Sequence, residues 1–187
     1  MSYQDERCEG LFLGNRQPRL EYIRGPPCTG EYSPILTSWK SRNIFDQQGV
    51  LTSSMNDMDS IIFLAPIWAF DQKLVDNPRI NRLEDSFILW KDVVSSSVFE
   101  RTNIILVLNK VDLMKRKLEN GVRFADYVIS YGDRPNDFES TSTYLRKHFA
   151  SIHKQYSPSP RPLYYYFTTA TDPGSAQRII GRVRQMA

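Results

Sequence analysis

The stretch Ile-Ile-Leu-Val-Leu-Asn-Lys-Val-Asp, residues 104–112, decides the fold of this chain. Five consecutive aliphatic residues end abruptly in Asn109, Lys110 and Asp112. An unbroken aliphatic run of this length is typical of a strand that is buried on both faces of a parallel sheet. The polar side chains then lie at the carboxyl end of the strand, where open α/β sheets bind their ligands. The stretch therefore predicts a buried strand followed by a candidate binding loop.

The residue types of this loop suit the recognition of a guanine base. The Asp112 carboxylate can accept two N–H bonds at once, from N1 and from the exocyclic amine of guanine. Adenine lacks that pair of donors and would leave the carboxylate desolvated and unpaired, so such a site rejects it. Asn109 can bridge to the N7 edge of the base, and the Lys110 stem can lie flat on the ring. The alternative interpretation is a strand that ends in an ordinary polar turn.

Length, composition and charge indicate a single globular domain. The 187 residues are 41% hydrophobic and 12% aromatic, which is enough for a sizeable core. With 24 basic and 21 acidic residues, the charge is too balanced to predict nucleic-acid binding. Two cysteines, Cys8 and Cys28, with no histidine at metal-ligand spacing, argue against a disulfide framework or a zinc site. We expect a cytoplasmic protein, because the sequence shows neither a transmembrane run nor a signal peptide.

Hydrophobic spacing predicts alternating strands and helices along most of the chain. Residues 1–42 show no period and predict mostly loop, with one short strand near residues 35–39. The helix that starts near residue 81 should expose Glu84, Asp85, Lys91 and Asp92. The predicted strands are 60–64, 102–108 and 163–167, and the predicted helices are 80–94, 141–156 and a last one capped by Asp172 and Pro173. This alternation predicts an α/β fold with a mainly parallel sheet.

A second polar motif, Asp46-x-x-Gly49, follows the short apolar pair Ile44-Phe45. It is compatible with a plain turn, which is the simpler interpretation. In nucleotide hydrolases an aspartate at such a strand end holds Mg²⁺ through water, and the glycine amide contacts the γ-phosphate. A third candidate is the loop Thr168-Thr169-Ala170-Thr171, which directly follows the last predicted strand.

These motifs together resemble one family. From about residue 43 to the C-terminus, the sequence resembles the C-terminal half of a heterotrimeric G-protein alpha subunit, especially the divergent alpha-subunit-like proteins of mushroom-forming fungi. The matching stretches are Ser-Ile-Ile-Phe-Leu-Ala (60–65), Phe-Asp-Gln (70–72), Asn-Arg-Leu-Glu-Asp-Ser (81–86), Asn-Lys-Val-Asp (109–112) and Thr-Thr-Ala-Thr (168–171). Two guanine loops in this order, with this helix between the strands, are a specific combination.

The resemblance implies a function and a set of site residues. It implies an incomplete Ras-like P-loop-NTPase domain that binds GTP or GDP with Mg²⁺ and transduces signals from G-protein-coupled receptors. The implied partners are beta-gamma subunits and a receptor, which would bring the chain to the inner face of the plasma membrane. The implied guanine-binding residues are Asn109, Lys110, Asp112, Thr169, Ala170 and Thr171, and the implied phosphate and Mg²⁺ remnants are Asp46 and Gly49.

The departures from the family pattern predict lost activity. No Gly-x-x-x-x-Gly-Lys-Ser/Thr motif occurs, so the phosphate loop and its strand and helix are absent from this sequence. Val50 stands where the resemblance places the water-positioning glutamine, and Cys28-Thr29-Gly30 resembles a remnant of switch I. The stretch that matches switch II is short, and the last helix ends at Ala187, before the family's receptor-contacting tail.

Two hypotheses follow for the function of this chain. The first is a GTP-binding transducer, and the second is a catalytically inactive relative that acts as an interaction module or is a truncated gene product. The domain division predicted is an irregular segment, 1–42, and a partial Ras-like domain, 43–187. Because the first strand is missing, we expect an exposed edge in the sheet.

Overall fold

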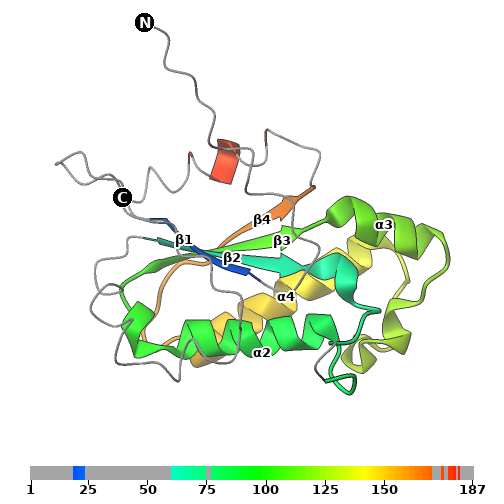
Figure 1. Cartoon of the computed structure of the whole chain (residues 1–187), viewed down its shortest axis with the longest axis horizontal. Coiled ribbons are helices and arrows are strands. Elements are labelled where there is room, and N and C mark those ends of the chain that lie inside the picture. The colour runs from blue at the N-terminus through cyan, green and yellow to red at the C-terminus, as the bar shows by residue number, and fades with distance from the viewer. Residues whose placement is uncertain are drawn as a thin grey trace, which may run out of the picture.

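The computed structural model describes residues 19–23, 60–74 and 77–169, together with residues 174, 177–179 and 181 near the C-terminus. A four-stranded sheet in the order β1-β2-β3-β4 forms its centre, with helices packed against it (Figure 1). The strands are β1 (Arg19–Ile23), β2 (Ser60–Pro66), β3 (Asn103–Asn109) and β4 (Tyr164–Thr168). The helices are α2 (Arg82–Ser95), α3 (Val111–Glu119) and α4 (Phe138–Tyr156), with 3-10 turns η2 (Ile67–Ala69), η3 (Ser97–Phe99), η4 (Phe124–Asp126) and η5 (Ile129–Tyr131).

Strands β2, β3 and β4 form the parallel part of the sheet. Ile61 lies opposite Ile104, and Leu106 lies opposite Tyr165, in register along the strands. Side chains on both faces of β3 are buried from Ile104 to Leu108, as an unbroken aliphatic run predicts. The prediction of an α/β fold with a mainly parallel sheet and flanking helices is confirmed, and the described residues form part of a Ras-like domain.

Strand β1 was not predicted. It pairs antiparallel with β2, with Leu20 opposite Phe63, so a segment of residues 1–42 supplies the strand next to β2. The outer strands of the described sheet are β1 and β4, so the expected exposed edge does not lie at β2 and stays a prediction for the sheet as a whole. The sequence Arg-Leu-Glu-Tyr-Ile is only five residues long, and an alternation this short does not separate a strand from a loop. The short strand predicted near residues 35–39 lies outside the described residues.

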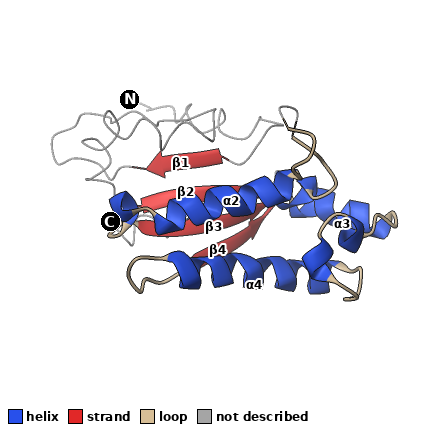
Figure 2. Ribbon diagram, turned by 90° about the horizontal axis from the view of Figure 1, so that it is seen from below, coloured by secondary structure: helices blue, strands red, loops and turns tan. Residues whose placement is uncertain are grey.

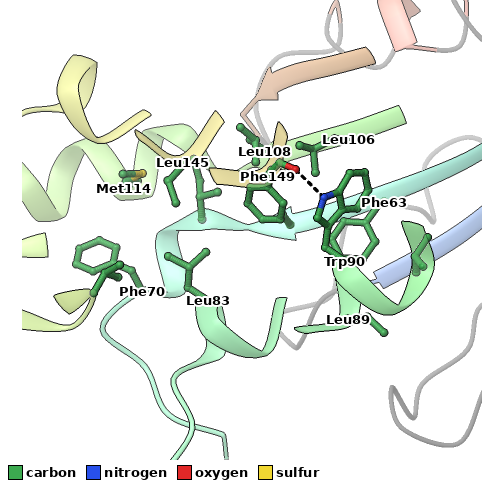
Figure 3. Packing of buried hydrophobic residues seen from close by; sticks show 14 of the residues in the cluster. Phe63, Phe70, Leu83, Leu89, Trp90, Leu106, Leu108, Met114, Leu145 and Phe149 are labelled. Atoms are coloured by element: carbon green, nitrogen blue, oxygen red, sulfur yellow. Dashed lines mark hydrogen bonds between the residues drawn. The ribbon is translucent and has the colours of Figure 1, made fainter. Parts of the chain in front are cut away.

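Helices α2 and α4 lie together on one face of the sheet (Figure 2). They bury the larger of two hydrophobic clusters, which contains Phe63 and Leu106 from the strands together with side chains from both helices. Within it, the indole Nε1 of Trp90 donates a hydrogen bond of 2.9 Å to the carbonyl oxygen of Phe149 (Figure 3). The opposite face carries the smaller cluster of Ile62, Ile105, Val107 and Ile179.

Helices α2 and α4 begin at side chains that cap them. Asn81 Oδ1 accepts from the Leu83 amide at 2.8 Å, and Asp137 Oδ1 accepts from the Ser140 amide at 2.7 Å. The second cap explains why α4 begins three residues earlier than predicted. The prediction that Asp85 is exposed is wrong, because its side chain is buried. The other three residues predicted on the solvent face of α2, Glu84, Lys91 and Asp92, are exposed.

The last predicted helix is described only in part. Residues 174, 177–179 and 181 are helical, whereas Asp172 and Pro173 lie outside the described residues. Within the described stretches, no helix combines the length and the apolar character that crossing a membrane requires.

Candidate functional site: the carboxyl edge of the sheet

The two loops predicted to read guanine leave the sheet side by side. Asn109 is the last residue of β3 and pairs in register with Thr168, the last residue of β4. The hydroxyl of Thr168 donates to Asn109 Oδ1 at 3.1 Å, which joins the two strand ends directly. Thr169 follows at once and is half-buried, while Ala170 and Thr171 lie outside the described residues. The carboxyl ends of parallel strands therefore bring the two motifs together at one edge.

The side chain of Asn109 is held in one orientation. Its Oδ1 accepts hydrogen bonds from the Lys110 amide, at 2.7 Å, and from Thr168. With the oxygen engaged, the Nδ2 group is the end of the amide that remains to meet a ligand, and it donates to no residue in the described part of the chain. An outward amide N–H donor matches an acceptor such as N7 of a purine.

Lys110 turns the chain sharply between β3 and α3. Its backbone has φ 63° and ψ 45°, the left-handed conformation, and among the described residues no other non-glycine residue has a positive φ. A non-glycine residue held in this region stores about 1–3 kcal/mol of strain, and such residues cluster at functional sites. Burial lowers the pKa of the Lys110 ammonium, the charge of Arg82 lowers it further, and Asp112 opposes the shift.

Asp112 lies in the first turn of α3, where the helix dipole favours a negative charge. One carboxylate oxygen, Oδ2, lies 3.6 Å from Arg116 Nη2. The other, Oδ1, is buried and has no hydrogen-bond partner among the described residues. Leaving a buried acceptor unpaired costs about 1–3 kcal/mol, which a ligand with N–H donors would recover. This unpaired oxygen is the feature of the edge that fits a guanine base.

Trp68 is a part of this edge that the sequence analysis missed. It lies in η2, directly after β2, and the ammonium groups of Lys110 and Lys117 lie 5.0 Å and 4.8 Å from its ring centroid. Lys117 also donates to the Trp68 carbonyl oxygen at 3.0 Å and forms an ion pair with Asp71 at 2.5 Å. The position of Trp68 and Asp71 in the sequence could have indicated this cluster, because both residues follow β2, which ends at the same carboxyl edge of the sheet.

The three basic residues 115–117 differ in how far their side chains are exposed. From the sequence alone, a solvated helix start explains this run at least as well as a nucleic-acid contact does, but the run lies in the C-terminal half of α3, where cations are favourable. Lys115 and Arg116 are exposed, as expected for solvated side chains. The side chain of Lys117 is only 22% exposed, because its ammonium group is held against Trp68 and Asp71.

The predicted phosphate and Mg²⁺ remnants lie outside the described residues. This holds for Asp46, Gly49 and Val50, and for the Cys28-Thr29-Gly30 stretch. Within the described part of the chain, no three metal-ligating side chains gather at one place. The roles given to these residues remain predictions.

Comparisons with known proteins identify the family. A family model of the G-protein alpha subunit matches residues 50–187, which include both guanine loops and begin just after Asp46 and Gly49. The alpha-4 subunit of Mycosarcoma maydis, a guanine nucleotide-binding protein, is 36% identical over 146 residues, covering 74% of this chain and 25% of the relative. The alpha-3 subunit of Dictyostelium discoideum is 36% identical over 136 residues, covering 70% of this chain and 23% of the relative.

A vertebrate relative gives the same result. Subunit alpha-13 of Mus musculus is 34% identical over 115 residues, covering 62% of this chain and 30% of the relative. The partial Ras-like domain thus belongs to a class of guanine nucleotide-binding proteins. The chain is a member of the G-protein alpha subunit family, as its motifs predicted, and spans between 23% and 30% of the length of these three relatives.

Proposed function

We propose that this chain is an alpha-subunit-like component of G-protein signalling that recognises guanine selectively but weakly and does not hydrolyse GTP. The observation that carries the proposal is the buried, unpaired Oδ1 of Asp112, beside the joined ends of β3 and β4. The fixed amide of Asn109 supports the same ligand, because it offers a donor at the same edge of the sheet. GDP and GTP are the nucleotides that this donor and acceptor pattern would select.

The number of contacts limits the affinity. A bidentate bond to Asp112, a bond to Asn109 and one from the Ala170 amide contribute roughly 1–3 kcal/mol each. Their sum of about 3–9 kcal/mol faces an association penalty of about 4–15 kcal/mol in lost translational and rotational freedom. The surplus corresponds to dissociation constants on the order of millimolar or weaker. Tight binding in this family draws on phosphate contacts and Mg²⁺, which the contacts at this edge do not supply.

Hydrolysis requires groups that this sequence does not contain. Phosphoryl transfer depends on a phosphate-loop backbone, its lysine, a bound Mg²⁺ and a residue that orients the attacking water. The 187 residues include no phosphate-loop motif, and Val50 stands where the resemblance places the water-positioning glutamine. Asp46 and Gly49 alone could not hold Mg²⁺ and a triphosphate. We therefore propose nucleotide recognition without turnover.

An alternative function is a purely non-enzymatic interaction module. The missing phosphate loop favours it, since signalling would then depend on protein contacts alone. The partners proposed from the family are beta-gamma subunits and a receptor, which would place the chain at the inner face of the plasma membrane. The two proposals differ in whether guanine binding occurs at all.

Titration with fluorescently labelled GTP and ATP separates these alternatives. We expect saturable binding of the GTP analogue only, abolished by Asp112→Ala and kept by Asp126→Ala, a matched change at an exposed carboxylate of η4. Absence of any signal that depends on Asp112 would reject guanine recognition and leave the interaction module. A parallel phosphate-release assay should detect no Mg²⁺-dependent turnover, and turnover that Asp112→Ala abolishes would overturn the proposal of an inactive chain.

A further inference from the structure

Helix α4 carries a second site candidate on the side that faces away from the core. A hollow of about 450 Å³ lies between α4 and the turn that precedes it. Its charged and aromatic lining consists of Arg134 from the turn and Tyr144, Lys147 and His148 from the helix, with serine and threonine hydroxyls beside them. None of these residues belongs to the guanine-reading edge. The volume lies within the range of about 300–1,000 Å³ that is usual for ligand sites.

Arg134 is already fixed at the wall of this hollow. Its Nη1 donates to the carbonyl oxygens of Tyr131 and Ser130, and its guanidinium carbon lies 5.4 Å from the ring centroid of Tyr144. Stacking on an aromatic face and bonding to backbone oxygens remove most of the rotamer freedom of an arginine. Binding an anion here would therefore require little further ordering of the side chain.

The two charged side chains in the lining of the hollow are both cations. Neither Arg134 nor Lys147 forms an ion pair with a carboxylate in the described part of the chain. His148 lies between Phe87 and Tyr144, with ring centroids 4.3 Å and 5.7 Å away. Burial lowers the pKa of His148, so its ring is neutral near pH 7 and extends the aromatic wall. The hollow thus combines two cations with an aromatic wall.

We propose that this hollow binds an acidic peptide segment of a protein partner. A carboxylate of the segment would lie between Arg134 and Lys147, and a neighbouring apolar side chain would pack on the Tyr144 ring. Arginine and lysine with a carboxylate form charge-assisted hydrogen bonds, and the aromatic wall gives the apolar neighbour a surface to cover.

The surroundings of the hollow favour a narrow peptide over a flat membrane. Exposed carboxylates of Asp133, Asp137 and Glu139 stand next to it in the chain, and Asp137 is bonded to Ser140 in its lining. An anionic bilayer would meet these carboxylates together with the two cations. A peptide strand can place one carboxylate between the cations and leave the acidic rim in solvent.

The test is fluorescence anisotropy with labelled peptides and the full chain. The acidic probe is Glu-Glu-Phe-Glu-Glu, and the matched neutral probe is Gln-Gln-Phe-Gln-Gln. We expect saturable binding of the acidic probe, weakened about tenfold or more by the double change R134Q/K147Q and by raised salt. The control R101Q/K154Q removes the same charge from exposed positions outside the hollow and should change affinity less than about twofold.

Two further measurements keep the inference falsifiable. Lys147→Gln alone, at an exposed side chain, should still weaken the acidic probe severalfold, so the outcome does not depend on Arg134 being dispensable for folding. The proposal is overturned by no saturable binding of the acidic probe, or by equal losses in R134Q/K147Q and R101Q/K154Q. A third result would also overturn it: phosphatidylserine vesicles bind the chain and lose that binding in R134Q/K147Q, while binding of the acidic probe is unchanged in the same variant.

Discussion

The covered face of the sheet and its carboxyl edge differ in whether their buried polar atoms have hydrogen-bond partners. Under α2 and α4, the indole N–H of Trp90 finds its acceptor inside the protein, at the carbonyl oxygen of Phe149. At the edge, one carboxylate oxygen of Asp112 is buried and has no hydrogen-bond partner among the described residues. A buried group with an internal partner contributes to stability, whereas one without a partner costs stability until something else binds it. The covered face stabilises the fold, and we propose that the carboxyl edge serves a ligand.

The largest expected effect is on the covered face. Trp90→Ala removes a fully buried indole and its hydrogen bond, and should lower the free energy of unfolding by about 3–5 kcal/mol. Trp90→Phe keeps most of the volume and should cost less than half as much. Urea denaturation followed by circular dichroism measures both variants. Ile129→Ala, at a side chain that is 90% exposed, is the control and should change stability little. A loss under about 1 kcal/mol for Trp90→Ala would contradict the role of the covered face.

The next effect concerns the amino end of the sheet, opposite the guanine edge. Arg161 donates to the carbonyl oxygens of Val94, at 2.9 Å, Thr102, at 3.2 Å, and Phe99, and so joins the end of α2 to the start of β3. Arg161→Gln should lower the free energy of unfolding by about 1–3 kcal/mol, because buried carbonyl groups lose a charged donor. The matched change Arg101→Gln, at an exposed side chain, should have no such effect. Equal denaturation midpoints for the two variants would refute this assignment.

His153 is an exception on the covered face, and it predicts a dependence on pH. His153 Nε2 is buried without a partner among the described residues, and burial, with the nearby charge of Arg161, lowers the pKa of His153. Since the unfolded chain then binds more protons, the contribution is complete above the unfolded pKa of about 6.5 and is lost as pH falls toward the folded pKa. The free energy of unfolding should therefore fall from pH 7 to pH 5. His153→Gln should reduce that fall, and an unchanged pH profile in this variant would contradict it.

The smallest effect on folding, and the sharpest contrast with Trp90, is expected at the edge. Asp112→Ala removes a carboxylate whose buried oxygen has no described partner, so the free energy of unfolding should change by less than about 1 kcal/mol or rise slightly. Asp71→Ala, which removes the ion pair with Lys117, should destabilise more, although the two side chains are similarly exposed. Thermal melts of both variants measure the difference. A large loss for Asp112→Ala would mean that this residue serves the fold instead of a ligand.

The sequence predicts the elements whose pattern is long and the loops whose chemistry is specific. The aliphatic run at 104–108 predicts a buried central strand. The spacing of Leu83, Trp90 and Val94 predicts α2, because a long periodic pattern is compatible with one type of secondary structure. The loop after residue 108 makes the family predictable, because few residue sets suit guanine, while guanine binding by this chain stays a prediction.

Features that depend on contacts between distant residues could not be predicted in the same way. Strand β1 is five residues long and gains its place only by pairing with β2. Lys117 looked like a solvated charge because Trp68 and Asp71, its partners, lie more than forty residues earlier in the sequence. The burial of Asp85 could not be predicted for a similar reason. Burial of a residue depends on what packs against its helix and not on the charge of its side chain.

The central claim is that the chain reads the base of a guanine nucleotide and not its phosphates. Ligand-observed NMR with guanosine, GDP, GTP and ATP, with and without Mg²⁺, tests it directly. The account predicts that guanosine, GDP and GTP bind in the millimolar range within about threefold of one another, independently of Mg²⁺, while ATP does not bind. Binding of GTP that is far tighter than that of guanosine and requires Mg²⁺, or equal binding of ATP and GTP, would contradict it.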